Sequence, residues 1–218
     1  MKFCLFSKAE FDITDPVALI ECYCIQTNFY SAYDLLIPHR QIDDVAKIGA
    51  RIDRGLLENI RGIVADTRDT QVFSHNLDYL LAQKADAIQA CAYQASEVLK
   101  RLMNVGIGLS QATKVLHTVY PHVMPMIDSM LQEEYRRTVD SAWSQSDPGQ
   151  ILYAYYINLR EQPNRGHLTD VYNRVAPTLP CLTKVRVFDI IWWSYLRAKK
   201  LAERTPVKLS TITAVVST

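Results

Sequence analysis

The sequence predicts an all-α protein, a bundle of about eight to ten helices that forms a single helical unit over 1–218 or two closely packed lobes. Three observations predict this class. Apolar residues recur three and four positions apart over most long stretches, which is the helical period. A clear helix-start signal, Asp15-Pro16, opens the first of these stretches. The composition, 49% hydrophobic and 22% charged, is that of a globular chain able to bury a sizeable core.

The N-terminal part is expected to begin with a short strand or extended lead-in over 1–11. A helix then starts at Asp15-Pro16 and runs to about Tyr33. The four residues 37–40 contain Pro38 and are expected to form a connector.

The next part is expected to be helical over 41–65, in one or two pieces. A polar loop follows over 66–74, and Ser74 or Asn76 caps a short helix. A long helix over 85–103 comes next. The apolar positions that share one face of the 41–65 segment are Ile42, Val45, Ile48, Ile52, Leu56 and Ile60.

A helix–hairpin–helix is predicted within 91–137. Gly106 and Gly108 interrupt the helical pattern, and the second helix should end near Tyr120 because Pro121 disfavours a helical residue before it. The first amides of that second helix lack intrahelical partners and carry the positive end of its dipole, so an anion such as a DNA phosphate suits them. The apolar face of the helix comprises Ala112, Val115, Leu116 and Val119.

Asp128 precedes another helical run, SMLQEEYRR. An aspartate at this position is favoured as an N-cap, where its carboxylate accepts backbone N–H bonds worth roughly 1 kcal/mol. Capping alone is one interpretation of Asp128. A catalytic role is the other, and the two are compatible because a carboxylate held by helix amides is kept ionised.

The C-terminal third is expected to contain a turn at Asp147-Pro148-Gly149, followed by a tyrosine-rich helix. A loop over 161–167 then precedes a short helix over 168–175. The last long helix is expected over 183–204 and is basic. Residues 205–218 lack a helix signal and are expected to form a strand or a loose tail.

The hairpin segment resembles the helix–hairpin–helix DNA glycosylases, the group that contains endonuclease III, the adenine-mismatch glycosylase and 8-oxoguanine glycosylase. The resemblance implies that Asp128 is the catalytic carboxylate at the mouth of a base pocket, and that Gly106 and Gly108 bind the DNA backbone. It extends over the segment 104–137. The residues that carry it are Gly106, Ile107, Gly108, Ala112, Leu116, Pro125, Ile127 and Asp128.

Members of that group that also cut the backbone carry a lysine two residues after the second glycine. Here Ser110 occupies this position, as in members that only remove the base, and Lys114 is not assigned the lyase role. Ser110 and Lys114 are instead candidate DNA contacts, together with Gln26 and Arg40. The alternatives are that Gln26 is the polar end of a core helix and that Arg40 is a solvated loop residue.

The resemblance implies a monofunctional DNA glycosylase that hydrolyses the N-glycosidic bond of a damaged or modified base, in repair or in defence against phages. Its partner would be double-stranded DNA with a flipped base. The alternative is a non-catalytic helix–hairpin–helix module that binds DNA or a protein. The whole chain also resembles a family of uncharacterised bacterial proteins that share the hairpin, a Pro-x-x-Asp-Ser step and the residues Arg186, Asp189 and Trp193.

Charge and cysteine content set further expectations. The net charge is only +1, but residues 1–90 hold nine Lys/Arg against thirteen Asp/Glu, so the basic excess lies in the half with the hairpin. The five cysteines show neither zinc spacing nor the four-cysteine run of an iron–sulfur cluster. No cofactor, metal site or membrane span is expected, and the protein is expected to be cytoplasmic. The oligomeric state is left open.

Overall fold

The computed structural model describes residues 1–6, 10–26, 29–161 and 164–204. Within these ranges it contains ten α-helices, three short 3-10 helices and a single pair of strands. The prediction of an all-α protein is therefore confirmed. The buried apolar side chains form one continuous cluster that includes residues of nearly every helix.

The two strands, β1 (Lys2–Cys4) and β2 (Glu10–Asp12), pair antiparallel. The indole Nε1 of Trp192 donates to the carbonyl of Cys4 at 3.2 Å and ties this ribbon to the last helix. Within 1–11 a single short strand or an extended lead-in was expected. Each strand has only three residues, too few for an alternating pattern, so the pairing depends on packing against the helices.

The first helical region comprises α1 (Pro16–Gln26) and α2 (Phe29–Leu36) and so reaches beyond Tyr33, where the helix was expected to end. The start is as expected, because the Asp15 carboxylate accepts from the amides of Val17 and Ala18. The two residues between the helices, 27–28, lie outside the described part of the chain.

The segment predicted to be helical over 41–65, in one or two pieces, is helical in two pieces, 42–48 and 54–65, but only 57–65 is α-helical and the rest of these pieces is 3-10 helix. Gly49 has a positive φ of 83° and ends the first 3-10 helix, and Asp53 caps the second by accepting from the Gly55 amide. The predicted polar loop also contains a 3-10 helix. Asn76 caps the next helix, as expected, by accepting from the Tyr79 amide at 2.9 Å. The elements are η1 (Ile42–Ile48), η2 (Arg54–Leu56), α3 (Leu57–Ala65), η3 (Gln71–Ser74) and α4 (Leu77–Ala82).

The helix–hairpin–helix itself forms with nearly the expected limits. Its helices are α5 (Ala85–Asn104) and α6 (Leu109–Val119), and α6 ends at Tyr120 as predicted. The helix that follows Asp128 is α7 (Ser129–Thr138).

The last helices are α8 (Pro148–Arg160), α9 (Asn164–Val175) and α10 (Lys184–Arg204). Asp147-Pro148-Gly149 begins α8 instead of forming a turn, with proline in the first turn, where its missing N–H costs nothing. The long terminal helix has nearly the limits expected for it, 183–204. Residues 205–218 lie outside the described part of the chain.

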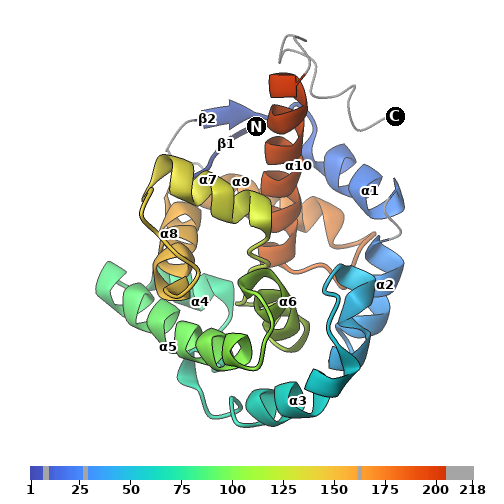
Figure 1. The fold of residues 1–218 in the computed structure, drawn as a ribbon. Coiled ribbons are helices and arrows are strands. Elements are labelled where there is room, and N and C mark those ends of the chain that lie inside the picture. The colour runs from blue at the N-terminus through green and yellow to red at the C-terminus, as the bar shows by residue number, and fades with distance from the viewer. Residues whose placement is uncertain (7–9, 27–28, 162–163, 205–218) are drawn as a thin grey trace.

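Figure 1 shows α10 running through the molecule with α1 and α7 beside it, while α5 lies along α8 on another side. α6 and the chain that joins it to α7 lie between these groups. This connecting chain carries Asp128, and its conformation determines what surrounds that carboxylate.

Candidate functional site

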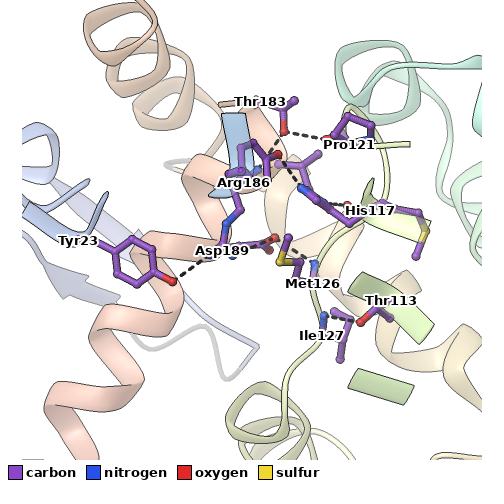
Figure 2. Close-up of polar contacts among 12 residues, drawn as sticks. Tyr23, Thr113, His117, Pro121, Met126, Ile127, Thr183, Arg186 and Asp189 are labelled. Carbon is purple, nitrogen blue, oxygen red and sulfur yellow. Dashed lines mark hydrogen bonds and ion pairs between the residues drawn. The ribbon is translucent and has the colours of Figure 1, made fainter. Parts of the chain in front are cut away.

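The segment 121–128, which joins α6 to α7, is held from both sides by side chains. The backbone N–H of Met126 donates to Asp189 Oδ2 at 3.0 Å, and that of Ile127 donates to Thr113 Oγ1 at 3.1 Å. Asp189 comes from α10 and Thr113 from α6, so two helices far apart in sequence fix the two residues that precede Asp128 (Figure 2). These bonds satisfy amides that an extended buried chain would otherwise leave unpaired.

The beginning of the same segment is held in the same way. Thr183 Oγ1 donates to the carbonyl of Pro121 at 2.7 Å, and His117 Nδ1 lies 2.5 Å from the carbonyl of Met124 (Figure 2). A carbonyl can only accept, so Nδ1 of His117 carries the proton and Nε2 accepts from the hydroxyl of Tyr33 at 2.7 Å. His117 is therefore a neutral, fully buried structural side chain, and burial lowers its pKa to about 3.

Asp128 is the N-cap of α7, and its Oδ1 accepts from the Leu131 amide at 2.9 Å. Burial raises the pKa of the Asp128 carboxyl, while the Leu131 N–H and the charges of Lys114 and Arg186 lower it. The side chain remains partly exposed. The capping interpretation is thus confirmed, and the carboxyl is still available to a ligand.

Asp128 borders a cavity of about 90 Å³. Small-molecule sites typically enclose some 300–1,000 Å³, so this space as it stands holds water or a fragment of a ligand. Its walls come from α1, η1, α6, α7 and α10 and from the segment before Asp128. The lining residues are Tyr23, Ile48, Lys114, Met126, Asp128, Leu131, Arg186, Asp189, Trp192, Trp193 and Leu196.

Lys114 lies at the cavity one helical turn beyond Ser110. Its Nζ donates to the carbonyl of Gly49 at 3.0 Å. Burial lowers the pKa of Lys114 and the charge of Asp128 raises it. The lysine and the aspartate therefore act on each other electrostatically across the cavity, although no direct ion pair joins them among the described contacts.

A second carboxylate, Asp189, lies at the back of the cavity and is only 5% exposed. It accepts from the hydroxyl of Tyr155 at 2.7 Å, and Arg186 Nη1 lies 3.9 Å from its Oδ2. Burial raises the pKa of Asp189 to about 7, against the lowering effects of the Arg186 charge and of its hydrogen-bond donors. Arg186 also donates from Nη2 to the hydroxyl of Tyr23 at 3.0 Å.

Two aromatic side chains form a partly exposed wall of the cavity. The rings of Tyr23 and Trp193 meet edge to face with centroids 5.2 Å apart. The guanidinium of Arg197 lies 5.0 Å from the centre of the Trp193 ring. Flat apolar side chains of this kind are those on which nucleic-acid bases stack.

The hairpin turn is exposed at both glycines. Gly106 has a φ of 103°, which only glycine adopts readily, and its amide donates to the carbonyl of Met103 at 3.0 Å. The amide of Gly108 donates to Gln111 Oε1 at 2.8 Å. The half-buried Ser110 accepts at its carbonyl from Thr113 Oγ1. Two of the hairpin amides are thus already paired within the protein, and Gln111 would have to turn away before Gly108 could bind a phosphate.

The remaining predicted contacts do not gather at the cavity. Arg40 lines a different groove, which contains none of the described residues that line the Asp128 cavity. Gln26 is the last residue of α1, and its side chain lies outside the described part of the structure. Of the predicted site residues, only Asp128 and Lys114 line the same cavity.

Sequence reasoning assigned no role to Tyr23, Asp189 or Trp193 and counted Arg186 only among the basic residues of the last helix, which could contact phosphates or form a solvated face, although all four line the cavity. A signal for three of them was present. Arg186, Asp189 and Trp193 are spaced i, i+3 and i+7, which places them on one face of a helix. A polar pair and an aromatic residue sharing a face with apolar neighbours indicate a site within the bundle. No comparable pattern singles out Tyr23.

No protein-family model, curated protein or solved structure matches this chain. Among the described residues, no group of three or more His, Cys, Asp or Glu side chains could hold a metal ion. A search of the same residues for helices of sufficient length and apolarity to cross a membrane finds none.

Proposed function

We propose that this protein is a monofunctional DNA glycosylase that removes a damaged or modified base, in repair or in defence against phages. The proposal rests on one observation, the position of Asp128 relative to the hairpin. Asp128 caps α7 at the edge of a cavity whose walls include Tyr23 and Trp193. The helix α6 begins at the glycine turn that resembles a phosphate-binding hairpin, and its residue Lys114 lines the same cavity.

The proposed chemistry uses Asp128 as a carboxylate. As the bond between base and sugar breaks, positive charge develops on the sugar, and a nearby carboxylate stabilises it and orients a water toward C1′. Lys114 supports this role, because its charge lowers the pKa of Asp128 and so favours the ionised form that burial disfavours.

The target nucleotide must leave the duplex before this bond can be reached. At about 90 Å³ the cavity does not hold a whole base, so the partly exposed side chains of Tyr23 and Trp193 must turn aside as the base enters. The two rings then provide the faces on which it stacks.

The alternative is a binding module that breaks no bond. Two observations favour it: the small size of the cavity and the pairing of the Gly108 amide with Gln111. Such a module would bind DNA or a protein through the exposed hairpin, and Asp128 would serve only as a cap.

The two functions are separated by incubating the protein with duplexes that carry varied bases, including phage-type modified cytosines, and testing for abasic sites by alkaline cleavage. The decisive variant is Asp128→Asn, since asparagine caps helices as well as aspartate and the fold should be retained. A matched control is Asp15→Asn, which makes the same change at the cap of α1.

The glycosylase proposal expects abasic sites with the wild type and with Asp15→Asn, and a loss of at least about a hundredfold in rate with Asp128→Asn. Duplex binding without abasic sites on any substrate would support the module. Equal rates for Asp128→Asn and the wild type would exclude Asp128 as the catalytic group.

A further inference from the structure

A second, larger groove lies at the other end of α6 from the hairpin. It has a volume of about 620 Å³, within the range typical of small-molecule sites. It is bordered by the C-terminal end of α6 at Val119 and Tyr120, by the connector that carries Arg40, and by the residues that lead into α10. We call it the Arg40 groove.

The charged and titratable side chains of the Arg40 groove favour an anion. Arg40, His75 and His122 line it, and the described lining residues include no carboxylate. Among the described contacts, the Arg40 guanidinium and the His122 imidazole make no hydrogen bond or ion pair, so their donors are available to a ligand.

Two carboxylates make contacts beside the groove. Asp34 accepts from the thiol of the lining residue Cys181 at 2.7 Å, and Asp78 is paired with the ammonium group of Lys184 at 2.7 Å. The charge of Asp78 is therefore balanced by Lys184, whereas Asp34 keeps its negative charge and is outnumbered by the cationic and imidazole side chains of the groove.

Two helix ends border the groove. Leu182 and Thr183 precede α10, whose N-terminal end carries partial positive charge, while Val119 and Tyr120 end α6, whose C-terminal end carries partial negative charge. Thr183 Oγ1 accepts from the Arg186 amide and donates to the carbonyl of Pro121, so the helix start is held rigidly against the wall of the groove.

The backbone at Arg40 is strained. Its φ of 51° lies in the left-handed region, and it is the only residue other than glycine with a positive φ in the described part of the chain. Glycine or asparagine adopts this conformation more readily than arginine does. Residues with a strained backbone are concentrated at functional sites, which agrees with a role for Arg40 in the groove.

We propose that the Arg40 groove binds a phosphorylated small molecule, with the phosphate at Arg40 and His122. The volume exceeds what a phosphate alone requires, so the rest of the ligand lies along the walls formed by Tyr120 and Tyr172. This site goes beyond the proposed glycosylase activity, because none of the described residues lining the groove lines the Asp128 cavity.

The test measures binding of inorganic phosphate and of a nucleoside 5′-monophosphate by calorimetry and by the ligand-induced rise in melting temperature. The variant is Arg40→Asn, which tolerates the left-handed backbone and removes the charge. The matched control is Arg54→Gln, which removes an exposed arginine that does not line the groove. His122→Asn provides a second variant that leaves the strained position untouched.

The proposal expects the monophosphate to bind more tightly than inorganic phosphate, with affinity reduced about tenfold or more by Arg40→Asn and by His122→Asn and unchanged by Arg54→Gln. Absence of binding to the wild type, or equal affinities for the wild type and both groove variants, would overturn it. So would a loss of duplex-DNA binding in Arg40→Asn without any effect on the monophosphate, because the groove would then belong to a DNA surface. Abasic-site formation is measured for the same variants. Its loss in Asp128→Asn, with normal rates in Arg40→Asn and His122→Asn, would show that the groove and the glycosylase site act independently.

Discussion

Two buried side chains near the candidate site make opposite contributions to the pH dependence of stability. Burial raises the pKa of Asp189 to about 7, so between about pH 4 and 7 the folded protein keeps a proton that the unfolded chain releases. This contribution to stability is complete below pH 4 and is lost as the pH rises. Burial lowers the pKa of His117 to about 3, so its contribution is present above about pH 6.5 and is lost as the pH falls.

Asp189→Asn should therefore change the slope of stability against pH. As the pH rises from about 4 to 7, the wild type should lose stability relative to the variant. The unfolding free energy of the variant minus that of the wild type should therefore increase by up to about 1.4 kcal/mol per pH unit. The measurement is urea denaturation at several pH values. Asp69→Asn, which removes an exposed carboxylate, is the control for the loss of one acidic group. A difference that stays constant with pH for Asp189→Asn would mean that Asp189 is ionised throughout this range.

At the scale of the element, the two glycines of the hairpin turn differ in whether the fold requires glycine at their positions. Gly106 needs glycine for its backbone, because its φ is 103°. Gly108 has an ordinary φ of −77°, and an added Cβ would lie 3.7 Å from Gln111 Oε1, a normal contact. The fold therefore does not require glycine at Gly108, and only close approach of a ligand to its backbone would.

Gly108→Ala should leave the free energy of unfolding within about 1 kcal/mol of the wild type. If the hairpin binds DNA, the added methyl group should weaken duplex binding about tenfold, measured by fluorescence anisotropy. Gly62→Ala is the matched control, since nothing lies within 4 Å of its added Cβ. This control should gain roughly 0.5–1 kcal/mol of stability within α3 and bind DNA like the wild type. Unchanged binding by Gly108→Ala would argue against a phosphate at this turn.

At the scale of the whole molecule, two basic residues of α10 are paired with glutamates of α7. Lys199 lies 3.2 Å from Glu134, which also binds Arg137, and Lys200 lies 3.3 Å from Glu133. Arg186 is buried inside the bundle. α7 has two glutamates and two arginines and so adds no net negative charge, but these pairings and the burial of Arg186 interrupt the row of basic side chains along α10.

DNA binding should consequently depend only modestly on salt. Each phosphate neutralised contributes a slope of about −0.9 in log K against log salt, so a few contacts at the hairpin predict a slope weaker than about −5. Anisotropy titrations between about 50 and 200 mM salt measure it. A slope near −10 would contradict this prediction and would require a cationic surface that the paired residues of α7 and α10 do not provide.

Features that depend on neighbours along the chain could be predicted from the sequence. The helix–hairpin–helix, the end of α6 at Tyr120 and the Asp128 cap follow from local steric and hydrogen-bond preferences, and all three are present. The helical content of 41–65 could be predicted, but the 3-10 conformation of its first piece and the position of the break could not. The apolar spacing runs through the whole segment, but Gly49 turns the chain there and its carbonyl accepts a bond from Lys114 in a distant helix.

The sequence by itself determined the helical class, the hairpin and the position of Asp128 before a helix, because helical periods, glycines and caps act over a few residues. Only the tertiary structure decided what faces that carboxylate. Tyr23, Lys114 and Asp189 come from three helices that meet only when the apolar core closes, and the Asp189 bond to the Met126 amide sets the path of the chain toward Asp128. Packing between remote segments also placed Arg40 in a separate groove, which no spacing along the chain encodes.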